Sequence, residues 1–415
     1  MKLLRALLLI LFAVLVISAL AAPGFIGPKV EEIWKQQLGR LQGGVSTGYQ
    51  RGWFGAETHT QVPLQNDKTE LHTEIHHGPL LFTAQGPKVG LVYSETRLQP
   101  EQLPAGLRAQ VEGLYGSLQG SPVVLESLVT ADNRVLNTLR LAPFQHIGER
   151  GELAFDGGEV SVETDYTGAV LTGSVDLGTL RQTRQGAEVF YVEPLKGTFQ
   201  FTPGRGGNAQ LHLPLLRMES DSGPVALRNI SLNLTLEQLA GNTLKLISDL
   251  QLPDVESTTP ITSVQQQITL PNIRAVNLGH YLSILLPSAR RDWPNAMRPP
   301  LRLQQQLAVE SRNGPVLVDA EINWRGMQRP PRQRYGNLLN QWLKPLVATV
   351  TLSAAEPALL QSPLVAQALL LREYGLLLEQ DGELQMLLEV NRGQLQVNGQ
   401  LLPPDLFIMA LTGTL

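Results

Sequence analysis

The chain has 415 residues, 43% of them hydrophobic, so it can bury the core of one large or two to three ordinary domains, and general disorder is excluded. Its 33 lysines and arginines are dispersed among 37 acidic residues, and the net charge of −4 excludes a basic stripe for nucleic acid. The absence of cysteine excludes disulfides, thiolate metal sites and a cysteine nucleophile.

The N-terminus contains a candidate membrane anchor. Lys2 and Arg5 lie at the start of an almost unbroken apolar run over residues 3–22. About 20 helical residues span roughly 30 Å, the thickness of the hydrocarbon core of a bilayer. Positive charge before the apolar run keeps the N-terminus cytoplasmic. We therefore expect residues 1–24 to form a transmembrane signal-anchor, with the bulk of the chain exported. The alternative is a signal peptide cleaved after Ala21, which releases a soluble exported protein.

Residues 25–45 are expected to form an amphipathic helix and a linker. Pro28 is suited to a first helical turn. Apolar residues then recur at helical spacing, and these are Val30, Ile33, Trp34, Leu38 and Leu41.

Residues 46–271 change to a period of two, which is typical of β-strands with one buried face. In the first predicted hairpin, which turns at Asn66 and Asp67, the dry face carries Phe54, Ala56, Thr58, Thr60, Val62 and Leu64, then Thr69, Leu71, Thr73 and Ile75. The polar face carries Glu57, His59 and Gln61, then Glu70, His72, Glu74 and His76. One-sided burial with short turns predicts antiparallel pairing. The expected fold is mainly β with helical insertions (α+β), built on large curved antiparallel sheets.

Residues 272–375 are expected to form a helical insertion, interrupted by a β-hairpin at about 301–325. The helical parts are residues 277–297 and 334–374, the second ending in a segment that Ser362 can cap and Pro363 can begin. Residues 376–415 are expected to form a C-terminal β-hairpin and tail.

The short segment YQRGWF concentrates aromatic residues in a chain that has only 6% of them. On a strand, Tyr49, Arg51 and Trp53 would share one face, with the guanidinium between two rings. This cluster either packs the first strand against a neighbouring helix or recognises a ligand.

The same segment, followed by His77-Gly78-Pro79, resembles the YdgA-like family of bacterial envelope proteins, a family of unknown function. The segments LLLREYG (369–375) and GQLQVNG (393–399) resemble it too. The resemblance implies a bacterial inner-membrane protein that spans the membrane once, with its bulk in the periplasm, and it implies no chemistry. Its motif residues are the candidates for binding an unknown ligand: Tyr49, Arg51, Gly52, Trp53, Phe54, His77, Gly78 and Pro79.

The polar face of the first predicted hairpin is the best candidate for metal chemistry. A turn centred on residues 66–67 would put His59 opposite Glu74, Gln61 opposite His72 and Glu57 opposite His76. Imidazole and carboxylate groups can bind zinc, so His59, His72, Glu74 and His76 are weak candidate ligands. No short metal-binding motif accompanies them, and an ordinary solvated sheet face is the favoured interpretation.

One-sided apolar strands in an exported chain beside a membrane favour a non-enzymatic function, with no catalytic residue and no cofactor. We expect the protein to bind an apolar envelope component, a lipid, or to act as a scaffold for envelope assembly. The expected partners are the inner membrane, through residues 3–22, and a lipid or an envelope protein, but not nucleic acid. The alternative is a metal-dependent envelope hydrolase that uses His59, His72 and His76.

Overall fold

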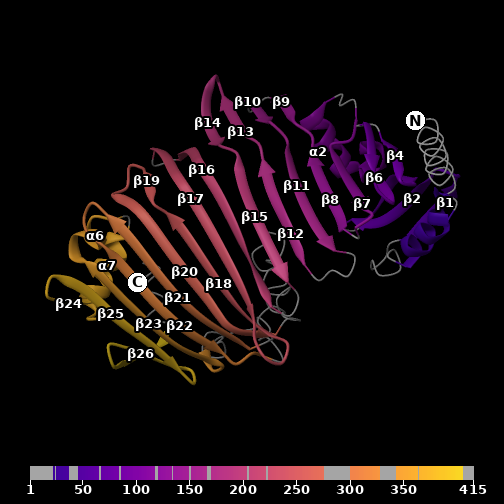
Figure 1. The fold of residues 1–415 in the computed structure, drawn as a ribbon. Helices are drawn as coiled ribbons and strands as arrows, with labels where there is room; N and C mark the ends of the chain where they lie inside the picture. Colours follow the sequence, from indigo (N-terminus) through magenta and orange to yellow (C-terminus); the bar gives the residue numbers. More distant parts are fainter. Residues whose placement is uncertain are drawn as a thin grey trace, which may run out of the picture. The chain divides into compact units, whose positions relative to one another are not determined.

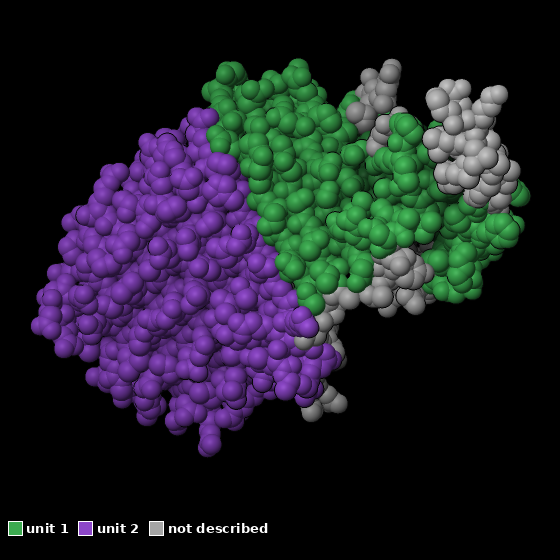
Figure 2. Space-filling view, viewed as in Figure 1, with its two compact units in different colours: residues 1–203 green, residues 204–415 purple. Residues whose placement is uncertain are grey.

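The computed structural model describes most of the chain, with gaps, between residues 22 and 404. The described ranges are 22–23, 25–36, 45–64, 67–83, 86–116, 120–132, 134–148, 151–165, 170–202, 205–220, 223–274, 300–327, 343–362 and 364–404. The chain divides into two compact units, residues 1–203 and 204–415, coloured separately in Figure 2. Each unit is built mainly from antiparallel strands, which confirms the predicted mainly-β class.

Unit 1 combines a helix over residues 25–36 with an antiparallel sheet. Its neighbouring strands are, in order, β1 (Val45–Arg51), β2 (Gly55–Leu64), β3 (Asp67–His77), β6 (Val92–Leu98), β7 (Val123–Val129), β8 (Arg134–Leu141), β11 (Gly158–Asp165), β12 (Leu171–Leu177) and β15 (Leu195–Thr202). Strands β4 (Leu80–Thr83) and β5 (Gly86–Val89) form a separate hairpin. A 3₁₀ turn, η1 (Pro100–Gln102), and helix α2 (Ala105–Tyr115) lie between β6 and β7.

A line of backbone breaks crosses four strands of unit 1. Beyond it lie β9 (Phe144–Gly148), β10 (Gly151–Phe155), β13 (Leu180–Arg184) and β14 (Ala187–Val192), which are joined to β8, β11, β12 and β15 through residues 142–143, 156–157, 178–179 and 193–194. Proline in two of these breaks removes a backbone donor, and Gly157 has a φ of 88°. The breaks face one another, since the amide of Gly178 donates to the carbonyl of Gly157 at 2.7 Å. The sheet is therefore interrupted along one line.

Unit 2 is an antiparallel meander in which most strands pair with the next one along the chain (Figure 1). The order is β16 (Gly206–Ser220), β17 (Gly223–Gln238), β18 (Thr243–Leu252), β20 (Ile261–Arg274), β21 (Leu301–Ser311), β22 (Val316–Trp324), β23 (Leu346–Ala355), β25 (Glu383–Asn391), β26 (Gln394–Val397) and β27 (Gln400–Leu402). Short strands β19 (Asp254–Glu256) and β24 (Leu378–Gln380) pair with β17 and β25.

Two helices cover the last long strands of unit 2 and form a buried hydrophobic core with them. These are α6 (Glu356–Leu360) and α7 (Val365–Glu373). Leu359, Ala368 and Leu371 from the helices pack with Ala354 of β23 and Leu384 of β25, and all five are buried. Removing this much apolar surface from water is what holds two short helices on the sheet.

The prediction of helix across residues 334–374 was wrong over residues 346–355, which form strand β23. The alternation Leu346, Ala348, Val350 and Leu352 has the period of a strand, and each of these residues lies opposite an apolar residue of β22. Helix is confirmed for α6 and α7, but the predicted cap at Ser362 is wrong, because α7 begins at Val365 with Leu364 at its N-cap and without a side-chain cap. The predicted β region 46–271 contributes strands to both units.

Two predictions fall wholly or mainly outside the described residues. These are the helix over residues 277–297 and the transmembrane helix within residues 1–24, of which only residues 22 and 23 are described. In the part of the chain that the structure does describe, no helix combines the length and apolar character needed to cross a bilayer.

Candidate functional site

The two N-terminal segments of the family resemblance, residues 49–54 and 77–79, meet at one corner of unit 1. Strand β1 ends at Arg51, and the chain turns through Gly52, whose amide donates to the carbonyl of Gly55 at 2.8 Å. The backbone amide of His77 then donates to the carbonyl of Phe54 at 2.7 Å. Segments more than twenty residues apart are thereby joined directly.

The predicted ladder of Tyr49, Arg51 and Trp53 on one strand face is wrong. Trp53 lies in the turn after β1, because Arg51 already pairs with Ala56 of β2 and the chain must reverse between them. The link from this segment to the neighbouring helix comes instead from Arg51, whose Nη1 lies 3.1 Å from Oε2 of Glu31. The ion pair is partly exposed, so it fixes position more than it adds stability.

His77 is the buried centre of this corner. Its ring is almost fully buried, and neither ring nitrogen has a hydrogen-bond partner among the described residues. A Cβ at Gly27 of the helix would lie 3.1 Å from Nδ1 of His77, so glycine permits the close approach. Burial lowers the pKa of His77, with further lowering from the charges of His76 and Arg51. The imidazole is therefore held neutral.

Gly78 and Pro79 complete the corner. Gly78 has a φ of 131°, and a Cβ there would lie 3.1 Å from Cγ of Pro23. The carbonyl of Pro79 accepts from the amide of Gly90 at 3.2 Å. The start of the helix, β3 and the β4–β5 hairpin thus meet at these residues. The geometry gives the motif an architectural role, and its role in ligand binding stays a prediction.

The faces predicted for the first hairpin are correct, but its register is not. Ala56, Thr58, Thr60, Thr69, Thr73 and Ile75 are buried on one face, as expected. In the structure, however, His59 lies opposite His72, Glu57 opposite Glu74 and Gly55 opposite His76. The predicted pairs are therefore displaced by two residues, which leaves every side chain on its predicted face.

The weak metal candidates do not converge in this register. Nδ1 of His59 lies 2.9 Å from Oε1 of Glu70, and Nε2 of His72 lies 3.6 Å from Oε1 of Glu74. The ring of His76 faces that of Tyr93, at 5.9 Å between centroids. Among the described residues, no three histidine or acidic side chains are placed to hold one metal ion. These histidines pair with neighbours on the sheet face instead.

A row of glutamates on the same face was not foreseen from the sequence. Glu57, Glu74, Glu95 and Glu126 lie directly opposite one another on β2, β3, β6 and β7. Like charges placed opposite each other destabilise a sheet, and Glu95 and Glu126 are also buried. An acidic residue within the apolar segment VVLESLV was the signal that could have revealed it.

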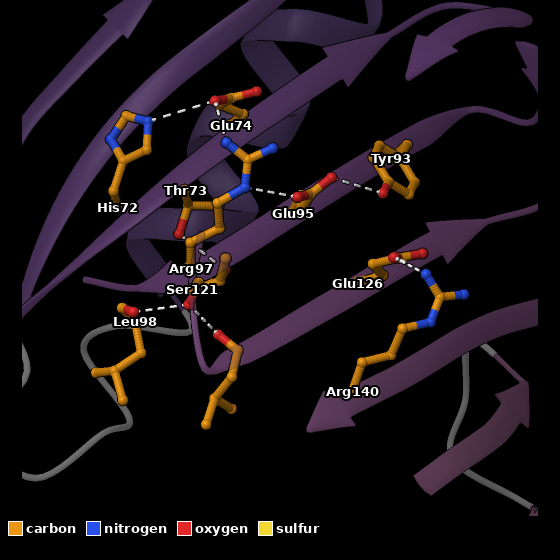
Figure 3. A network of polar contacts seen from close by, with 12 residues as sticks. His72, Thr73, Glu74, Tyr93, Glu95, Arg97, Leu98, Ser121, Glu126 and Arg140 are labelled. Atoms are coloured by element: carbon orange, nitrogen blue, oxygen red, sulfur yellow. Dashed lines mark hydrogen bonds and ion pairs between the residues drawn. The ribbon is translucent and has the colours of Figure 1, made fainter. Parts of the chain in front are cut away.

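Cations pair with three glutamates of this row, Glu74, Glu95 and Glu126 (Figure 3). Arg97 bridges two carboxylates, with Nε 2.7 Å from Oε1 of Glu95 and Nη1 3.2 Å from Oε1 of Glu74. The hydroxyl of Tyr93 donates to Glu95 at 3.1 Å, and burial followed by the charge of Glu95 raises the pKa of Tyr93 well above its usual 10. The cation of Arg140 lies 2.5 Å from Oε1 of Glu126. With every buried carboxylate paired, the row is a structural ion network.

Unit 2 presents a different surface, a row across eight neighbouring strands that is apolar at every position except one. Its members, each paired with the next, are Leu211, Leu232, Leu250, Gln266, Leu307, Val318, Leu352 and Met386. We call this the apolar row, with seven apolar members and Gln266 as the polar one. Every member stays partly exposed to solvent. The buried core under α6 and α7 begins at its end, with Ala354 and Leu384 two residues along β23 and β25 from Leu352 and Met386.

The opposite face of the same strands is polar. Its matching row consists of Asn233, Asp249, Gln267, Gln306, Asp319 and Thr351. An open hollow of about 500 Å³ lies over this face between β20 and β23 and is lined largely by glutamine and threonine. The sheet of unit 2 is therefore wet on one face, while its other face is apolar without being fully buried.

Residues 1–260 match a family described as bacterial protein of unknown function (DUF945). The chain belongs to this family. Because YdgA is a DUF945 member, the resemblance is confirmed for the segments at residues 49–54 and 77–79, while the segments at residues 369–375 and 393–399 lie beyond the matched region. The DUF945 match covers all of unit 1 and strands β16 to β19 of unit 2. The apolar row therefore begins within the family region and continues beyond it. No curated protein and no solved structure matches the chain.

Proposed function

We propose that this DUF945 protein is a non-enzymatic, membrane-anchored protein of the bacterial periplasm that binds a lipid along the apolar row of unit 2. The observation that carries the proposal is the partial exposure of all seven apolar members of the row. An apolar row that its own chain leaves partly exposed gains stability when an apolar molecule covers it.

The dimensions of the row suit an extended hydrocarbon chain. Neighbouring strands lie about 4.8 Å apart, so seven intervals between eight strands span roughly 34 Å. This length is close to the hydrocarbon thickness of a bilayer, about 30 Å, which two acyl chains fill end to end. One acyl chain lying across the strands would therefore contact apolar side chains on about half of them, and the row has room for two chains in line. The helices α6 and α7 mark the closed end of the row.

The anchoring part of the proposal rests on the sequence. The apolar run over residues 3–22 has the length of a membrane span, and the positive charge precedes it. An anchor of this kind would place both units on the periplasmic side, next to a supply of lipid. A scaffold for envelope assembly would use the same face for a protein partner.

Binding of a fluorescent fatty acid to the purified full-length protein tests the lipid site. Val318 in the apolar row is replaced by aspartate, and the matched control is Leu317→Asp, an exposed residue one position away on the polar face. We expect Val318→Asp to weaken binding at least tenfold, and Leu317→Asp to leave it unchanged. Equal loss in both variants, or no uptake by the wild-type protein, would contradict the lipid site.

A second form of the test avoids a buried charge during folding. The chain has no cysteine, so Val318→Cys can be modified with a charged thiol reagent after the protein has folded. Modification should block uptake of the probe, whereas modification of Leu317→Cys should not. Uptake that persists after modification at Val318 would show that the apolar row is not the site.

A further inference from the structure

The β4–β5 hairpin of unit 1 presents large apolar side chains outward. Leu80 is 52% exposed, Phe82 73% and Val89 73%, whereas Leu81 between them is only 1% exposed. The pairs Leu80 with Val89 and Phe82 with Pro87 put these residues on one face of the hairpin. An antiparallel hairpin on a soluble protein normally turns its polar face to water, so this face is made for an apolar environment.

Two aromatic side chains at the adjoining corner are exposed as well. Trp53 is 58% exposed and Phe54 56%. They are joined to the hairpin through His77, which lies only three residues before Leu80. The amide of His77 donates to the carbonyl of Phe54. We call Trp53, Phe54, Leu80, Phe82 and Val89 the apolar foot. A group of large exposed apolar residues marks a binding surface, unlike single exposed residues such as Ile147.

The chain segment next to the apolar foot indicates that the foot contacts a lipid bilayer. The apolar run of residues 3–22 ends immediately before Pro23. Pro23 is buried and lies against Gly78, two residues before Leu80. The chain therefore passes from the candidate membrane span directly to the base of the hairpin. If residues 3–22 cross a bilayer, the surface of that bilayer lies where the apolar foot is.

We propose that the apolar foot inserts into the interfacial layer of the bilayer that residues 3–22 cross. This inference rests on the proposed membrane anchor. Trp and Phe suit the boundary between headgroups and acyl chains, where the ring is covered and polar atoms stay wet. Together with the span, the foot gives unit 1 a second attachment point and so fixes its orientation at the membrane.

The charges around the foot favour apolar insertion over attraction to anionic lipid. In the described part of this corner, four cations pair with acidic residues of the chain itself: Lys29 with Glu32 at 2.9 Å, Lys35 with Glu31 at 2.7 Å, Arg51 with Glu31 at 3.1 Å and Lys88 with Glu126 at 3.1 Å. Neutralised cations contribute little to binding a negative surface. Bilayers of phosphatidylcholine, which is zwitterionic and carries no net charge, should therefore suffice for insertion.

Site-directed fluorescence on the full-length protein in phosphatidylcholine vesicles tests the foot. The absence of native cysteine allows single labels at Phe82→Cys and Val89→Cys with an environment-sensitive dye, and spin-labelled lipid serves as the quencher. The control is Ile147→Cys on β9, which is 76% exposed in the same unit. We expect blue-shifted emission and lipid quenching at residues 82 and 89, a water-like signal at residue 147, and no gain from anionic lipid.

A label at Val14→Cys, within the apolar run, separates the two proposals. Quenching at residue 14 with a water-like signal at residues 82 and 89 would overturn the foot and leave the anchor in place. A water-like signal at all of these positions would overturn both. A third outcome is quenching between labels at residue 82 that persists in detergent without lipid. It would show that the face binds a second copy of the chain, and it would also overturn insertion of the apolar foot into the bilayer.

Discussion

Glu95 on β6 lies directly opposite Glu126 on β7, and both side chains are buried. Two carboxylates in this arrangement repel each other in a medium that screens poorly. They are tolerated because each is paired with cations, Glu95 with Arg97 and Glu126 with Arg140 and Lys88. Unit 1 therefore depends on buried charge pairs as well as on apolar packing.

Removing one cation from a buried charge pair should lower the stability of unit 1. Arg97→Met leaves Glu95 with only the hydroxyl of Tyr93, so we expect the free energy of unfolding to fall by about 2 kcal/mol. Arg134→Met is the control, because its partners Asp132 and Glu163 are exposed and the loss should be much smaller than that of Arg97→Met. Urea denaturation measures both, and equal losses would contradict the buried network.

The neutral state of His77 predicts that acid destabilises unit 1. Its pKa in the folded protein lies below the usual 6.5, so the unfolded state binds more protons. The contribution to stability is complete above about pH 6.5 and is lost as the pH falls below that value. We expect His77→Gln to flatten the dependence of the urea midpoint between pH 8 and pH 5. Exposed His212→Gln is the control, and an unchanged slope in His77→Gln would contradict the prediction.

A substitution of Arg51 tests whether this motif residue is needed for the stability of the fold. Its ion pair with Glu31 is partly exposed on both sides, so Arg51→Gln should lower the free energy of unfolding by less than about 1 kcal/mol. Thermal and urea denaturation measure this directly. A loss of several kcal/mol would mean that Arg51 stabilises the corner through more than this surface pair.

A side chain at position 173 should clash with the neighbouring strands in the middle of the sheet of unit 1. A Cβ at Gly173 on β12 would overlap the ring of Phe199 on the opposite strand and the carbonyl of Ser161. Gly173→Ala should therefore destabilise unit 1 by about 2 kcal/mol. Gly113 in α2 is the control, because a Cβ there would meet no described atom within 4 Å. Gly113→Ala should stabilise the helix by up to about 1 kcal/mol, and the same sign for both variants would contradict the argument.

The alternation of apolar and polar residues correctly predicted which residues lie on each face of the first hairpin, because side chains on a strand alternate between two sides. The same pattern could not choose the register. A slip of two residues returns each side chain to its original face, so the predicted pairing of His59 with Glu74 and the observed pairing with His72 fit the sequence equally well. The metal hypothesis depended on that register, and the tertiary pairing removed its geometric basis.

The sequence by itself determined the mainly-β class, the membership of the DUF945 family and which residues of a strand share a face. These follow from local alternation and from short motifs that need no partner. Only the tertiary structure decided that four glutamates share one row, that Arg51 reaches Glu31 and that the apolar row stays partly exposed. Each of these depends on which strand or helix becomes a neighbour, and that is fixed by the combined packing of segments far apart in the chain.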